Sequence, residues 1–267
     1  MEPTRAISVL DKGFVRLVDV MGDDGAIVQA ARVSYGAGTK TVREDAALID
    51  YLMRHRHTSP FEMVEFKFHV KAPLFVVRQW FRHRTASVNE VSGRYSVLKD
   101  EFYEPAAFRR QARRNKQGSE GELEDEEARA LLQEAEEKAY QAYERLLEKG
   151  VAREMARMVL PLNLYTEFYW KQDLHNLFHF LKLRLAPEAQ WEIRQYAQAI
   201  AELVKAHVPL AWRSYEEHVL HGASLSRTEL AALRGLITPE LYEKALTSLG
   251  LSGSRLKEAL EKLFGPG

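Results

Sequence analysis

The chain has 267 residues, of which 46% are hydrophobic, enough for one large domain or for one domain with an appendage. Its 38 basic and 38 acidic residues cancel, which argues against a dedicated binder of nucleic acid or of membrane surfaces. The absence of cysteine excludes disulfides, thiolate metal sites and thiol nucleophiles. No apolar run is long enough to span a bilayer and residues 1–5 do not begin a signal peptide, so we expect a cytoplasmic protein.

The N-terminal half is predicted to mix strands and helices. Apolar and polar residues alternate over 14–20 and again over 63–70, the pattern of half-buried strands. Asp23-Asp24 predicts a cap for a helix that continues through Arg32. The other elements predicted here are a helix at 42–55, a helix that begins at Pro73 and ends in the cluster at 82–84, and an extended piece at 88–95.

The C-terminal half is predicted to be mainly helical. Residues 109–127 change from basic to acidic and indicate a mobile surface loop, which leads into a helix over about 123–149 that Gly150 ends. The elements predicted after it are a short helix at 152–159, an aromatic strand at 162–170 and helices at 174–183, 188–207 and 209–220.

The chain changes character after Gly222. Helix starts at Ser226, Thr238 and Ser254 indicate a helical tail without a chemical motif. We therefore predict a domain over 1–222 and a C-terminal helical extension over 223–267 that serves packing or oligomer contacts. The pattern as a whole predicts an α+β fold, with an antiparallel or mixed sheet packed by several long helices.

Polar chemistry is concentrated in residues 78–95. Arg82-His83-Arg84 follows an apolar run, and such a cationic cluster is costly to bury without anionic partners. Ser92-Gly93-Arg94 then offers a hydroxyl, a flexible backbone and a planar fork for phosphate. The residues alone leave two interpretations open: a solvated helix end with a polar turn, or a site for a phosphorylated ligand.

No glycine-rich phosphate loop is present, because Gly36-Ala37-Gly38 lacks the third glycine of a dinucleotide fingerprint. Side chains and helix ends would have to hold the phosphates of a dinucleotide. His175 and His179 have metal-ligand spacing, but no third ligand follows locally, so we expect no metal. Arg157 and Arg184 lie among apolar residues, where a guanidinium needs either a structural carboxylate or a bound anion.

The spacing of Arg82-His83-Arg84, seven further residues and Ser92 resembles the signature of flavin-dependent thymidylate synthases. The resemblance covers roughly residues 7 to 220. It is supported by four further stretches: Leu10-Asp11-Lys12-Gly13-Phe14, Ala31-Arg32-Val33-Ser34, His57-Thr58-Ser59-Pro60-Phe61-Glu62 and Leu160-Pro161-Leu162-Asn163.

The resemblance implies the fold of this family and its reaction. A methylene passes from 5,10-methylenetetrahydrofolate to C5 of dUMP and is reduced by hydride from FADH2, which NADPH recharges. It also implies a homotetramer with sites shared between chains. The chain has no cysteine and cannot attack the pyrimidine ring as the unrelated family of thymidylate synthases does.

The resemblance also assigns residues to ligands. Those implied for FAD are Ser59, Arg82, His83, Arg84, Glu90, Asp173, His175 and His179. Those implied for dUMP are Gln79, Arg82, Glu90, Ser92, Arg94, Arg157 and Arg184, with Arg184 promoting ionisation of the pyrimidine. The chain departs from a commonly seen pattern, which has Asn, Arg and Asn at positions 173, 175 and 179.

Two alternatives compete with this interpretation. One is another FAD-dependent reductase that uses the same pocket. The other is a nucleic-acid-binding protein that uses Arg78, Arg82, Arg84 and the basic run 109–114. Zero net charge and the adjacent acidic run count against the second, so we expect neither nucleic acid nor membrane as a partner.

Overall fold

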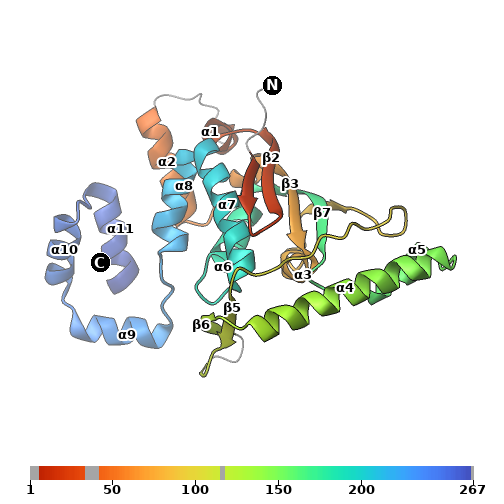
Figure 1. Cartoon of the computed structure of the whole chain (residues 1–267). Coiled ribbons are helices and arrows are strands. Elements are labelled where there is room, and N and C mark those ends of the chain that lie inside the picture. The colour runs from red at the N-terminus through yellow and green to blue at the C-terminus, as the bar shows by residue number, and fades with distance from the viewer. Residues whose placement is uncertain (1–5, 34–41, 115–117, 266–267) are drawn as a thin grey trace. The chain divides into compact units, whose positions relative to one another are not determined.

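The computed structural model describes residues 6–33, 42–114 and 118–265 and contains a five-stranded antiparallel sheet (Figure 1). Gly36-Ala37-Gly38 lies outside the described residues. The strands follow the order β1-β2-β3-β7-β4. Their bounds are β1 Ala6–Val9, β2 Gly13–Met21, β3 Glu65–Pro73, β4 Ser87–Glu90 and β7 Tyr165–Asp173.

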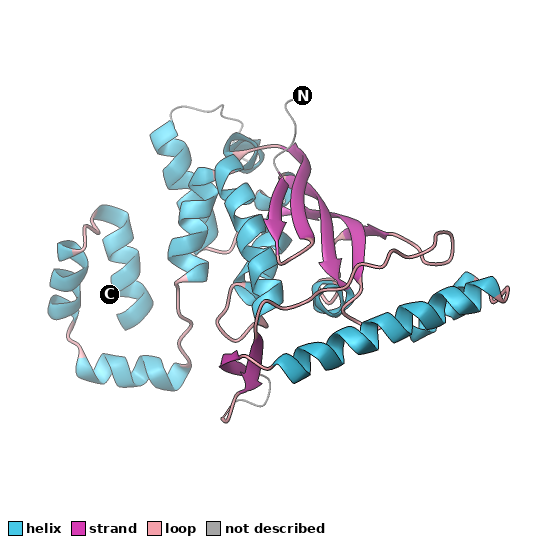
Figure 2. Cartoon of the chain, viewed as in Figure 1, coloured by secondary structure: helices cyan, strands magenta, loops and turns pink. Residues whose placement is uncertain are grey.

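The pairing of β3 with β7 forms the middle of the sheet. It runs without a break from Glu65 opposite Asp173 to Pro73 opposite Tyr165. Alternate side chains of β3 are completely buried on one face, namely Phe66, Phe68, Val70 and Ala72. Figure 2 shows helices packed along the sheet, and contacts join α7 to β1 and β2 and α6 to β7. Burial of this apolar face is the main stabilising term of the fold.

The helices of the first unit join and cover the strands. Asp23 caps α1 by accepting from the backbone N of Ala26, as predicted, and Asp24 accepts from the backbone N of Leu210 and Ala211 at the start of α8. Neighbouring acidic residues thus fix two helix starts. The helices are α1 Asp24–Arg32, α2 Val42–Arg54, η2 Phe61–Met63, α3 Leu74–Trp80, α4 Glu126–Glu148, α5 Arg153–Ala156, η3 Arg157–Val159, α6 Leu174–Arg184, α7 Trp191–His207, α8 Pro209–Tyr215 and η4 Glu216–Leu220.

The predicted α+β class with an antiparallel sheet is confirmed, and several local predictions are wrong. The segment predicted as a loop contains a hairpin of β5 Phe108–Gln111 and β6 Ser119–Leu123. The short strand β1 is absent from the predicted elements. Helix α3 ends at Trp80, so the cationic cluster follows it in a turn. The extended piece predicted at 88–95 is strand only to Glu90, because a turn begins after Ser92.

The chain divides into two compact units, Met1–Leu220 and His221–Gly267. The second contains α9 Arg227–Leu236, α10 Pro239–Ser248 and α11 Gly253–Phe264. Ser226 forms the expected capping box with Glu229, and Thr238 caps α10. Helix α11 begins at Gly253, one residue before the predicted start. None of the described helices combines the length and apolarity needed to cross a bilayer.

The close approach of Gly13 to its neighbours generates a test of the packing. A Cβ at this position would lie 2.1 Å from the Tyr196 hydroxyl oxygen and 2.6 Å from the Val9 carbonyl oxygen. The Tyr196 hydroxyl also donates to the Lys71 carbonyl, which holds it in place. Gly13→Ala should therefore lower the free energy of unfolding by about 1–3 kcal/mol through overpacking.

Thermal and denaturant unfolding would measure this effect. The control is Gly235→Ala within α9, where an added Cβ meets nothing within 4 Å. Alanine there should be neutral or stabilising because it favours helix. Equal stability of the two variants would contradict the packing argument.

Candidate functional site

An aromatic cluster around Trp80 anchors the end of α3. The Trp80 ring is completely buried, with its centroid 5.3 Å from that of Trp170 on β7 and 5.1 Å from that of Phe180 on α6. One tryptophan therefore ties α3 to both a strand and a helix. Beyond the turn, Gln172 donates to the Thr85 carbonyl at 3.0 Å. The cationic cluster at 82–84 is thus held at both of its ends.

The three residues of that cluster lie in different environments. Arg82 and Arg84 are exposed, and neither forms a hydrogen bond or ion pair with any residue that the structure describes. His83 is half-buried, with its ring centroid 5.0 Å from that of Phe180 and 5.8 Å from that of His179. The turn therefore presents two available guanidinium groups beside an imidazole packed on the core.

Arg184 meets this turn from the end of α6. Its Nε donates to Nε2 of His83 at 3.1 Å, and its Nη2 donates to the backbone carbonyl of Gln79 at 3.0 Å. Burial lowers the pKa of Arg184, yet a guanidinium stays charged at neutral pH. Since neither partner is a carboxylate, this half-buried cation is not neutralised within the described chain. A structural carboxylate, one of the two expected partners, does not contact Arg184 among the described residues; its guanidinium bonds two uncharged groups instead.

His83 is held as a neutral ring. Burial, followed by the charges of Arg184 and His179, lowers its pKa from 6.5 to about 4. Because Arg184 donates to Nε2, this nitrogen is the acceptor and the proton of the neutral ring lies on Nδ1. The ring therefore carries one N–H donor, at Nδ1, without a positive charge.

A second group of predicted residues gathers at the turn after β4. The backbone N of Arg94 donates to the Ser92 hydroxyl, and the Arg94 side chain pairs with Glu154 at 3.0 Å. An added Cβ on Gly93 would lie 3.1 Å from Cδ of Arg157, so the stem of Arg157 packs against this turn. Arg157 is exposed on η3, and the expectation that it lies among core residues is wrong. The exposed Arg94–Glu154 pair contributes little stability, so the Arg94 side chain is available to an anionic ligand.

The remaining predicted residues are more dispersed. Glu90 on β4 accepts from the Thr166 hydroxyl at 2.8 Å, whereas Ser59 is exposed just before η2. Asp173 caps α6, accepting from the backbone and side-chain nitrogens of Asn176 at 2.9 and 2.7 Å. His175 is half-buried in the first turn of the same helix. Both Asp173 oxygens thus serve the cap of α6, and a carboxylate, which only accepts and is negatively charged, is a poor partner for a phosphate.

Contacts across long sequence separations add residues that spacing did not indicate. Thr166 donates a hydrogen bond to Glu90, and Glu154 forms an ion pair with Arg94. The side-chain amide of Gln79 bonds to that of Gln190. Only the strand pairing of β4 with β7, which places Thr166 near Glu90, could have been anticipated from the pattern. Within the described ranges, no group of three or more metal-binding side chains occurs, and His175 and His179 gain no third ligand.

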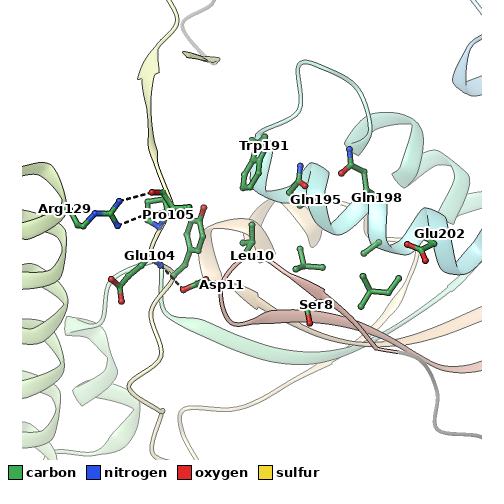
Figure 3. A pocket seen from close by; sticks show the side chains of 15 residues that line it. Ser8, Leu10, Asp11, Glu104, Pro105, Arg129, Trp191, Gln195, Gln198 and Glu202 are labelled. Atoms are coloured by element: carbon green, nitrogen blue, oxygen red, sulfur yellow. Dashed lines mark hydrogen bonds between the residues drawn. The ribbon is translucent and has the colours of Figure 1, made fainter. Parts of the chain in front are cut away.

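A cavity of about 650 Å³ lies on another part of the first unit (Figure 3). It is bordered by β1, by the segment around Glu104 and by residues of α7 that include Trp191 and Gln198. None of the predicted site residues lines it. The cavity is therefore separate from the residues that the sequence predicted for the site.

The fold and the two arginine clusters define a class: an α+β protein with two clusters of side-chain cations and, in its sequence, no glycine-rich phosphate loop. Comparison with known proteins specifies the class further. Residues 16–210 match the family described as thymidylate synthase complementing protein, Thy1. The chain therefore belongs to the family of flavin-dependent thymidylate synthases.

Individual relatives agree with this assignment. A flavin-dependent thymidylate synthase of Thermus thermophilus is 83% identical over 267 residues, covering 100% of this chain and 99% of its own length. One from Treponema denticola is 54% identical over 265 residues, with 97% of each chain covered. A UMP/dUMP methylase, PolB, of Streptomyces cacaoi, solved with 5-Br dUMP, has a TM-score of 0.73 and 35% identity, covering 79% of this chain and 97% of its own.

The environment of His83 predicts a pH-dependent stability. Because its pKa is about 4 in the folded chain and near 6.5 when exposed, the unfolded chain binds more protons between these values. The folded state should therefore lose stability as the pH falls from 6.5 toward 4. His83→Gln keeps an acceptor for Arg184 but does not titrate, so its stability should fall less.

Thermal unfolding of flavin-free protein at pH 7 and pH 5 would compare the two. His207→Gln, which removes an exposed imidazole on α7, is the matched control and should behave like the parent chain. An equal decrease of Tm in the parent chain and in His83→Gln would show that His83 does not titrate as described.

Proposed function

We propose that this chain makes dTMP from dUMP with 5,10-methylenetetrahydrofolate as the one-carbon donor, and that its two cationic clusters divide the work. The observation that carries this proposal is the half-buried Arg184, a cation without a carboxylate partner among the described residues. Such a charge calls for an anionic ligand or for negative charge that develops on one. Family membership supplies the reaction, and FAD, when bound, contributes the hydride that NADPH replaces.

The cationic turn suits a flavin dinucleotide. Arg82 and Arg84 have free donors on an anchored turn, as a pyrophosphate requires in a chain without a glycine-rich phosphate loop. His83, neutral and packed on Phe180, offers a flat surface for the flavin ring. Further proposed FAD contacts are Ser59, Glu90, Asp173, His175 and His179, of which Asp173 acts by fixing the start of α6.

The proposed dUMP site uses the second cluster together with Arg184. Arg94 and Arg157 would hold the phosphate beside the Ser92 hydroxyl. Arg184 would lie near O4 and N3 of uracil, where a cation stabilises negative charge on the ring and makes C5 more nucleophilic. Three further proposed contacts to dUMP are Gln79, Arg82 and Glu90.

The proposal includes a homotetramer whose sites combine residues of different chains. Within the described part of the chain, no hydrogen bond or ion pair connects the cluster around Arg184 with the cluster around Arg94. A substrate that needs both clusters could bridge two chains. We place the activity in residues 1–222 and assign no chemistry to 223–267, and the cytoplasm stays our expected location.

Substitution of Arg184 tests its role in catalysis. Arg184→Ala should retain FAD and its reduction by NADPH, because neither step needs an ionised uracil. Formation of dTMP at saturating dUMP should fall by about two to three orders of magnitude, the loss typical when one preorganised electrostatic donor is removed. Arg184→Lys keeps the charge but cannot reach both His83 and Gln79, so it should be intermediate.

Flavin content, anaerobic flavin reduction and dTMP yield would be measured on the same preparations. Wild-type dTMP formation by Arg184→Ala at saturating dUMP would reduce Arg184 to a binding residue.

A second test concerns the cofactor. Arg82→Ala/Arg84→Ala removes two charge-assisted contacts of roughly 1.5–3 kcal/mol each, so FAD retention during purification should collapse. Arg110→Ala/Arg213→Ala removes the same charge from exposed positions on the hairpin and α8 and should retain FAD. Absorbance of the released flavin per chain gives the stoichiometry, and full occupancy in the first double variant refutes the assignment.

A further inference from the structure

A line of hydrogen bonds runs from the β5–β6 hairpin to the predicted substrate residue Gln79. Nη2 of Arg109 lies 2.6 Å from Oε1 of Glu192, and Nε2 of Gln190 donates to Oε2 of the same carboxylate at 2.9 Å. Nε2 of Gln79 in turn donates to Oε1 of Gln190. We call these four residues, Arg109, Glu192, Gln190 and Gln79, the Glu192 relay.

Glu192 is the fixed point of the relay. Its side chain is buried, with the residue 3% exposed, and the Tyr103 hydroxyl donates to its carboxylate at 3.3 Å in addition to Arg109 and Gln190. The Arg109 guanidinium in turn stacks over the ring of Trp191, at 5.3 Å from its centroid, beside the cavity of Figure 3. A buried carboxylate that is ion-paired and accepts from three donors has little freedom to rotate.

The relay has a direction that follows from elementary hydrogen-bond chemistry. A carboxylate only accepts, so Gln190 has to turn its NH2 group toward Glu192. The amide oxygen of Gln190 then faces Gln79 and accepts a hydrogen bond from the NH2 group of Gln79. The amide oxygen Oε1 of Gln79 is thereby left as the free acceptor at the end of the relay.

Gln79 lies directly at the Arg184 cluster, because its backbone carbonyl accepts from Nη2 of Arg184 at 3.0 Å. We propose that Glu192 is a positioning residue for dUMP: through Gln190 it sets the Gln79 amide so that Oε1 accepts from a donor of the substrate. Uracil N3–H and the sugar hydroxyl are such donors. The inference rests on the proposed binding of dUMP at this cluster.

Substitutions along the relay should change dUMP affinity without changing flavin content. Glu192→Gln offers Gln190 an NH2 group instead of a carboxylate oxygen, which reverses both amides and removes the free acceptor. Gln190→Leu, at an exposed position, breaks the relay without disturbing the core. Each should weaken dUMP binding about tenfold, the effect of one misdirected hydrogen bond.

The decisive variant exchanges the two side chains. In Gln190→Glu/Glu192→Gln, the amide at 192 accepts from Arg109 and donates to the new carboxylate at 190, which again accepts from Gln79. The orientation of Gln79 is restored, so dUMP affinity should return to within about twofold of the parent chain, since one hydrogen bond is regained. A purely structural role of Glu192 predicts no such rescue. Glu136→Gln, another buried carboxylate that accepts an amide from Asn163, should leave affinity unchanged.

Calorimetric titration of FAD-loaded protein with dUMP gives the dissociation constants. If Gln79→Ala weakens binding while Glu192→Gln and Gln190→Leu do not, the relay is refuted and the proposed function stands. If Gln79→Ala itself has no effect, the placement of dUMP at Gln79 fails first. An exchanged variant that binds dUMP as weakly as Glu192→Gln also overturns the relay. If Glu192→Gln does not fold, the dUMP affinity of Gln190→Leu tests the relay in its place.

A substrate analogue identifies the donor. 2′,3′-Dideoxyuridine monophosphate lacks the 3′-hydroxyl but keeps N3–H. If Gln79 accepts from the hydroxyl, the parent chain and Glu192→Gln should bind this analogue equally. If Gln79 accepts from N3–H, the tenfold difference should persist.

Discussion

The packing of Trp80 is the interaction on which the site depends. Its ring lies completely buried between Trp170 of β7 and Phe180 of α6, so the end of α3 cannot shift without opening the core. His83 follows three residues later and packs on the same Phe180. A rigid apolar cluster therefore fixes the backbone that carries the charged side chains. Truncation of a ring in that cluster should displace the cationic turn as well as lower the free energy of unfolding.

The clusters have in common that their cations lack strong internal partners. Arg184 bonds only to an uncharged imidazole and a backbone carbonyl among the described residues, and Arg94 has only an exposed pair with Glu154. A half-buried charge that is not neutralised lowers the stability of the ligand-free chain. An anionic ligand at such a cation would remove that penalty, and its binding would stabilise the folded chain.

Sequence patterns predicted the α+β class and most helices, because apolar periodicity and caps such as Asp23 are local signals. They did not predict the β5–β6 hairpin, because its mostly polar and charged strands do not alternate apolar with polar residues and give no strand signal. The motif placed candidate residues in the site, but not their partners. His83 and Arg184 are 101 positions apart, and the link from Gln79 to Gln190 spans 111, so only the folded chain brings them together.

The pairing of β3 with β7 also bears on how the chain acquires its activity. The paired residues lie about 100 positions apart, so the loop between them has to close before either strand gains its hydrogen bonds. During synthesis, β3 with Phe66 and Phe68 is made well before its partner strand β7, so its apolar face is exposed in the meantime. The cationic turn is anchored only when Trp170 and Phe180 have joined Trp80. The turn can therefore take its position only after Phe180 has been made, and until then the nascent polypeptide carries an apolar face that depends on rapid burial or on a chaperone.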